Sequence, residues 1–151
     1  AQHVAFDFQS LVSQTGYLPA TDWTIPEAFL CLILAAASAD GVVPPEEHME
    51  IKALARRSRV LKSLDAGELA RTNHVLALRM KQRPRALQEA CQTLPADMRP
   101  SIFAHCADIL LADGSLAQAE AEFLNRIMSF LQLDELEARR QVEALLIKNR
   151  Y

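Results

Sequence analysis

The chain has 151 residues, a formal net charge of −3 at pH 7 and 50% hydrophobic residues, which is enough for one soluble globular domain with a buried core. Its most hydrophobic run, residues 29–37, is much shorter than the roughly 20 apolar residues of a transmembrane helix. Residues 1–25 also lack the order of basic, apolar and small residues that marks a signal peptide. We therefore expect no transmembrane segment and a cytoplasmic location.

The apolar spacing is helical along almost the whole chain, and no useful stretch alternates apolar and polar residues as a half-buried strand does. After a loose start over residues 1–25, we expect helices over 26–40, 44–58, 63–80, 84–94, 99–112, 117–131 and 134–148. Prolines open several of them, Ser63 or Asp65 can cap the third, and Asp134 can cap the last. The sequence predicts an all-α bundle of about seven helices.

Residues 26–58 are repeated as residues 99–131, so that a helix, a short corner and a second helix occur twice. Both corners read Ala-Asp-Gly, and Asp40 and Glu47 in the first copy correspond to Asp113 and Glu120 in the second. A unit with a single apolar face cannot bury that face alone. We therefore expect the two copies to pack about a pseudo-twofold axis around one core.

The acids of the two corners have a purely structural interpretation. The glycine of each corner can end a helix in the left-handed conformation. The acids then accept hydrogen bonds from the first turn of the next helix, where the exposed N–H groups and the helix dipole favour carboxylates. Capping without a metal explains all four acids.

The second interpretation is a site for a divalent cation. A regular EF-hand loop is excluded, because its first ligand positions would fall on Ala36 and Ser38 in one copy and on Ile109 and Leu111 in the other. A shared site is still available if the twofold packing brings the corners together, since four carboxylates are enough for a small divalent cation with waters. Its ligands would be Asp40, Glu47, Asp113 and Glu120, with Asp108 in the same neighbourhood and His48 as a marginal addition.

The doubled Ala-Asp-Gly corner on paired helices resembles the tellurite-resistance TerB family and the related middle domains of membrane-anchored J-domain co-chaperones. The matching segments are residues 35–47 and 107–133, each with the helix that follows it, so the resemblance divides the chain into an N-terminal extension (1–25) and a TerB-like helical domain (26–151). It implies a pseudo-symmetric helical bundle, a stress-response role through protein partners rather than turnover, and a cluster of proposed metal ligands at Asp40, Glu47, Asp113 and Glu120. The two halves need not bind a cation equally, because Ala119 stands opposite Glu46.

The sequence carries no recognisable signature of catalysis. Its four histidines are scattered, and no HExxH, GxSxG or phosphate-binding glycine loop occurs. His105 and Cys106 lie in the middle of a predicted helix among apolar residues and have no evident partner base. We therefore expect a protein that is not an enzyme. The three cysteines form no CxxC pair and are expected to be core residues.

Charge is distributed unevenly along the chain. Residues 52–85 hold ten Lys or Arg and two acids, a net +8, and the remainder carries −11. These cations are either solvated side chains near helix C-termini or a surface for an anionic partner such as an acidic protein, a lipid surface or nucleic acid. Nucleic acid is the least favoured of these partners, because the chain has few aromatic residues and no motif that reads nucleic acid.

Two hypotheses follow from these observations. The first is a metal-responsive TerB-like module that binds a divalent cation at its acidic corners and displays a surface for protein partners. The second is a metal-free helical interaction domain that binds an acidic partner through the basic stretch 52–85. The sequence decides neither whether the chain forms a homo-oligomer nor what residues 1–25 do.

Overall fold

The computed structural model of the chain describes residues 22–39, 54, 56–112 and 114–149. Helices are the only regular elements of these residues, and no strand occurs among them. The helices are α2 (Ile25–Ala37), α4 (Ala66–Gln82), α5 (Ala86–Thr93), α6 (Arg99–Leu111), α7 (Gln118–Phe130) and α8 (Glu135–Lys148). The predicted all-α class is therefore confirmed. Most of the helix predicted over 44–58 lies outside the described residues.

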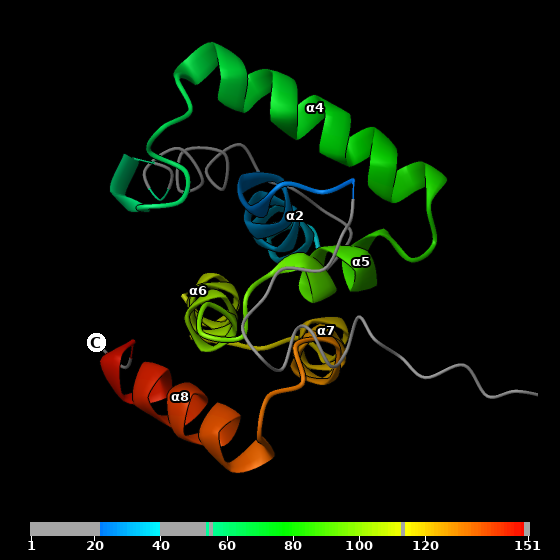
Figure 1. The fold of residues 1–151 in the computed structure, drawn as a ribbon. Coiled ribbons are helices and arrows are strands. Elements are labelled where there is room, and N and C mark those ends of the chain that lie inside the picture. The colour runs from blue at the N-terminus through cyan, green and yellow to red at the C-terminus, as the bar shows by residue number, and fades with distance from the viewer. Residues whose placement is uncertain (1–21, 40–53, 55, 113, 150–151) are drawn as a thin grey trace, which may run out of the picture.

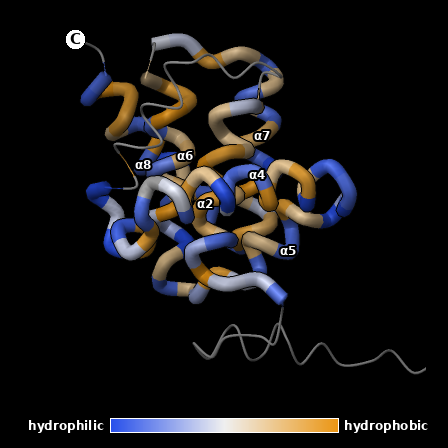
Figure 2. Tube along the Cα trace, turned by 90° about the horizontal axis from the view of Figure 1, so that it is seen from above, coloured by the Kyte–Doolittle hydropathy of each residue, from blue (hydrophilic) through white to orange (hydrophobic). Residues whose placement is uncertain are grey.

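Helix α2 is the centre of the bundle (Figure 1). It packs against α4 on one side and against α5 and α6 on the other, while α6 also contacts α7 and α8. Figure 1 shows α4 and α8 crossing the view at opposite ends of the molecule, with the remaining helices between them. Eight of the 13 residues of α2 are buried, because a helix that is apolar around most of its circumference must be covered on several sides. The hydrophobic stretches gather in the middle of the molecule, and hydrophilic ones lie at the outer turns (Figure 2).

Three helices begin at side-chain caps that the sequence encodes. Asp65 accepts from the N–H of Glu68 at 2.8 Å and Asp134 from the N–H of Glu137 at 3.2 Å, which confirms the predicted caps and selects Asp65 over Ser63. Thr24 and Glu27 form a reciprocal capping box at the start of α2, with bonds of 3.2 and 2.8 Å. That box was not predicted from the sequence.

The end of α2 differs from the prediction. The helix stops at Ala37, earlier than the expected Asp40-Gly41, and Ser38 caps it. The N–H of Ser38 donates to the carbonyl of Leu34 at 3.1 Å, and its hydroxyl donates to the same carbonyl at 2.8 Å. A serine hydroxyl that competes for a backbone carbonyl favours a helix end, which explains the early stop.

The three cysteines lie in the core, as predicted. All are free and buried, on α2, α5 and α6. Burial raises the pKa of Cys31 to about 12 and also raises the pKa values of Cys91 and Cys106. Thiols in such surroundings stay protonated, so they act as small apolar side chains rather than as nucleophiles.

Among the residues that the structure describes, the core holds one charged side chain, that of Arg99, which is 5% exposed. Its Nε donates to the carbonyl of Leu94 at 2.9 Å, and its two Nη atoms donate to the carbonyls of Leu131 and Gln92 at 3.4 Å. These acceptors follow α7 and lie at the end of α5, so one guanidinium joins the C-terminal ends of two helices to the start of α6. Burial lowers the pKa of Arg99.

The predicted internal repeat is described for its second copy only. Helices α6 and α7 pack together and form one helix-corner-helix unit, but most of the matching partner of α2 lies outside the described residues. The pseudo-twofold relation therefore stays a prediction. Of the described helices, none combines the length and the apolar character needed to cross a bilayer.

Candidate functional site

The structure describes one of the four predicted cation ligands of the acidic corners, Glu120. Asp40, Glu47 and Asp113 lie outside the described residues, as does His48, so the structure does not test whether the corners meet. Glu120 lies in the first turn of α7, as predicted. Among the residues that the structure does describe, no three His, Cys, Asp or Glu side chains form a group that could hold a metal ion.

The corner between α6 and α7 turns at Gly114. This residue has φ +80°, and its N–H donates to the carbonyl of Leu111 at 3.1 Å. An added Cβ would meet no atom within 4 Å, so the backbone conformation rather than lack of space explains the glycine. The left-handed helix end predicted for this copy of the Ala-Asp-Gly motif is confirmed.

Glu120 caps the helix that follows the corner. Its Oε1 accepts from the N–H of Ala117 at 2.9 Å. This is half of a capping box, because the side chain of Ala117 has no atom that can accept in return. The structural interpretation of this acid is therefore supported, and Oε2 has no role in that bond. Carboxylate oxygens are hard donors of the kind that Ca²⁺ and Mg²⁺ prefer. Oε2 of Glu120 would be the oxygen available to such a cation, because Oε1 accepts from Ala117.

Asp108 was expected in the neighbourhood of the corner, but its carboxylate is engaged elsewhere. Its Oδ1 and Oδ2 lie 3.0 and 3.3 Å from Nζ of Lys148, and the side chain of Asn149 donates to Oδ1 at 3.3 Å. These contacts attach the end of α8 to α6. Asp108 is thus part of a helix-to-helix contact within the bundle.

The basic stretch separates into two kinds of cation. Arg79 and Arg83, at the end of α4, contact side chains of other parts of the fold. The guanidinium of Arg79 stacks 4.4 Å from the ring centre of Trp23 and lies 3.5 Å from Glu27. Arg83 pairs with Asp22 at 2.8 Å and with Glu89 at 3.3 Å, and its neighbourhood lowers the pKa of Asp22. Both cations therefore have partners within the chain, and the binding of an anionic partner by the basic stretch stays a prediction.

The other cations of this stretch that the structure describes are exposed. We call the four of them between α2 and α4 the 56–62 basic segment: Arg56, Arg57, Arg59 and Lys62. None of these side chains forms an ion pair with a residue that the structure describes. Arg71, Lys81 and Arg85 are exposed in the same way on and after α4.

A hollow of about 490 Å³ lies between the 56–62 basic segment and α6, and we call it the Arg57–His105 pocket. Arg57, Ser58 and Arg59 line one side of it, and Ser101, His105 and Asp108 of α6 line the other. His105 is half-buried, and its ring meets that of Phe29 edge-on with 5.8 Å between centres. Burial lowers the pKa of His105, Arg57 lowers it further and Asp108 opposes both. The imidazole is therefore neutral at pH 7. Sequence patterns gave no sign of this pocket, because its walls are distant in the chain.

Comparison with known proteins identifies the family of the chain. Residues 26–142, well over half of the chain, match the family model for Tellurite resistance protein TerB. The chain belongs to the TerB family. No curated protein and no solved structure matches it. The resemblance drawn from the doubled corner is thus confirmed. The match covers α2 except its first residue, all of α4, α5, α6 and α7, and more than half of α8.

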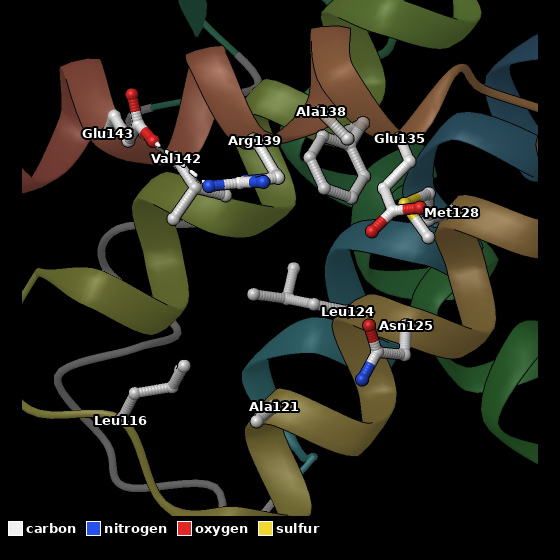
Figure 3. Close-up of a pocket in the computed structure, with 11 residues that line it drawn as sticks. Leu116, Ala121, Leu124, Asn125, Met128, Glu135, Ala138, Arg139, Val142 and Glu143 are labelled. Carbon is white, nitrogen blue, oxygen red and sulfur yellow. Dashed lines mark ion pairs between the residues drawn. The ribbon is translucent and has the colours of Figure 1, made fainter.

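The TerB domain has a further hollow of about 320 Å³ between α7 and α8 (Figure 3). Apolar side chains from both helices line it, among them Leu124, Met128 and Val142, and Leu116 lies at its lower edge in the view. Arg139 and Glu143 lie at the rim, 3.9 Å apart. This groove is apolar with a charged rim, and the described residues supply nothing that covers it.

Proposed function

We propose that this TerB domain is a non-enzymatic module of a stress response that binds a divalent cation at its paired Ala-Asp-Gly corners. The observation that carries the proposal is the left-handed turn at Gly114, which comes directly after Asp113 and leads into the helix whose first turn holds Glu120. Such a turn reverses the chain between two acids that the sequence repeats in both halves. Membership of the TerB family over residues 26–142 supports the same conclusion.

The proposed ligands are the carboxylates of Asp40, Glu47, Asp113 and Glu120. Carboxylate oxygens are hard donors that Ca²⁺ and Mg²⁺ prefer, and like charges gathered in one place repel unless a cation compensates them. Glu120 would use Oε2, since Oε1 is engaged with the N–H of Ala117. The cation would supply charge neutralisation and would hold the two helix-corner-helix units together, which presents one fixed surface to protein partners.

The test is thermal unfolding of the chelator-treated protein to which Ca²⁺, Mg²⁺, Mn²⁺ or Zn²⁺ is returned. A cation at 100 times its Kd stabilises the native state by about 2.7 kcal/mol, which raises the Tm of a chain of this size by about 5–10 °C. The double variant Asp40→Asn, Asp113→Asn should lose this rise. Asn caps helices about as well as Asp, so the variant should keep most of its cation-free stability.

The matched control is Asp134→Asn, which changes a helix-capping acid that has no proposed metal role. It should leave the cation response intact. Either of two results would contradict the proposal: no rise in Tm with any of the four cations, or the same rise in the double variant.

A second candidate function, the binding of an acidic protein partner, is favoured by the exposed 56–62 basic segment. Four cations without ion pairs to described residues leave an uncompensated positive surface, which attracts acidic proteins most strongly at low salt. Reversing two of them in Arg56→Glu, Lys62→Glu should abolish the binding of fluorescent polyglutamate, whereas Arg139→Glu, Arg140→Glu on α8 should not. Equal effects of the two pairs would remove this candidate.

A further inference from the structure

We propose that the Arg57–His105 pocket is a binding site for a small organic anion, one that carries a carboxylate or phosphate head on an apolar body. The site uses none of the four acids of the cation proposal, so the failure of one proposal leaves the other untouched. Its volume of about 490 Å³ is within the roughly 300–1,000 Å³ range of small-molecule sites. The argument rests on the donors, the charge balance and the apolar wall of this pocket.

The donors for the anionic head lie on one hydrogen-bonded turn. Arg57 and Arg59 both line the pocket and have no ion pair with a described residue, and guanidinium groups bind carboxylate and phosphate oxygens in a bidentate manner. Ser58 lies between them, and its Oγ accepts from the N–H groups of Val60 and Leu61 at 3.2 and 3.3 Å. Because the hydroxyl acts as an acceptor in those two bonds, its hydrogen is left to donate to a ligand.

The charge balance of the pocket favours an anion with a single charged head. Asp108 lines the pocket, but Lys148 and Asn149 occupy its oxygens. Asp97 also lines the pocket and is exposed, so it offsets one of the two arginines. The remaining excess is one positive charge. His105 is neutral at pH 7 and can add one N–H donor from α6.

The rest of the wall is apolar and comes from three parts of the chain. Phe29 of α2 and Leu54 are buried, while Val60 and Met98 are half-buried beside them. An inorganic anion would leave the exposed parts of Val60 and Met98 in contact with water, whereas an organic anion covers them as its head reaches the arginines. The combination of apolar wall and arginine pair therefore selects for an amphipathic ligand.

The experiment titrates the protein with benzoate and phenyl phosphate while the imidazole of His105 is followed by NMR over pH. An anion within about 4–6 Å favours the charged imidazolium, so the bound probe should raise the pKa of His105 by about one. Asp108 and Arg57 also act on this imidazole, and Arg59 and Asp97 line the same pocket, so the comparison is made on one protein with and without probe. Acetate and inorganic phosphate, which have a head but no body, should bind at least about tenfold more weakly.

Two variant pairs separate a site from general charge attraction. Arg57→Gln, Arg59→Gln removes the pocket donors and should weaken the preferred probe by at least about tenfold, while Arg56→Gln, Lys62→Gln removes the same charge from outside the pocket wall and should weaken it less than about threefold. Binding of benzoate but not phenyl phosphate identifies a carboxylate head, and the reverse identifies a phosphate head. Equal weakening by the two pairs, or no saturable binding of either probe to the folded protein at about 10 mM, overturns the proposal.

Discussion

Replacing the buried Arg99 by methionine should destabilise the fold, although the change removes a charge from the core. Methionine keeps most of the apolar stem but deprives the carbonyls of Leu94, Leu131 and Gln92 of their donor. Two of those acceptors belong to residues that are only 1% exposed, so water is poorly placed to replace the guanidinium.

The magnitude follows from the three distances. The bond to Leu94 at 2.9 Å involves a charged donor and contributes about 1.5–3 kcal/mol, whereas the two bonds at 3.4 Å are long and contribute less. Relief of the cost of burying a guanidinium, which is visible in the lowered pKa of Arg99, acts in the opposite direction. We expect a net loss of about 2–3 kcal/mol, or a fall in Tm of about 5–10 °C.

The assay is urea unfolding followed by circular dichroism, with stability taken from the midpoint at an unchanged slope. Arg139→Met is the control, because the side chain of Arg139 is 67% exposed and its pair with Glu143 is long, so its loss should cost less than about 0.5 kcal/mol. If Arg99→Met proved as stable as the parent protein, the joining of α5 and α7 through Arg99 would be refuted as a source of stability.

Three further results are expected. Gly114→Ala should lower the free energy of unfolding in urea by about 1 kcal/mol, because it places a side chain at φ +80°. Gly67→Ala, inside α4, should raise it by about 0.5 kcal/mol. A loss at Gly67 as large as that at Gly114 would contradict the conformational explanation. The free energy of unfolding should decrease as pH falls below about 6.5, because the lowered pKa of His105 makes the folded protein bind fewer protons than the unfolded chain. His105→Gln should reduce this pH dependence. An unchanged slope of the free energy of unfolding against pH would exclude His105 as its source. All three buried cysteines should stay unmodified by a thiol reagent in the native protein and react after unfolding, and rapid labelling of the native protein would show that the core opens.

Local sequence signals predicted much of the helical framework. The caps at Asp65 and Asp134, the position of Glu120 and the turn at Gly114 all depend on residues within one or two turns of one another, which is the range over which spacing rules operate. The Thr24–Glu27 capping box is equally local, although Pro26 alone predicts a start one residue after the observed Ile25.

Interactions between distant residues could not be read from the sequence. The roles of Arg79 and Arg83 depend on Trp23 and Asp22, which approach them only in the fold, so both arginines resembled the solvated cations beside them. The burial of Arg99 has no sequence signal either, because its acceptors are backbone carbonyls. The family followed from a short motif because that motif occurs twice at corresponding positions.

The most direct test of the cation proposal is calorimetric titration of the chelator-treated protein with Ca²⁺, Mg²⁺, Mn²⁺ and Zn²⁺, repeated for Asp40→Asn and Asp113→Asn as single variants. A site shared by both corners predicts one cation per chain and the loss of binding in either variant. No binding of any of the four cations to the folded protein, or binding that neither variant weakens, would contradict the shared site and leave these acids as helix caps.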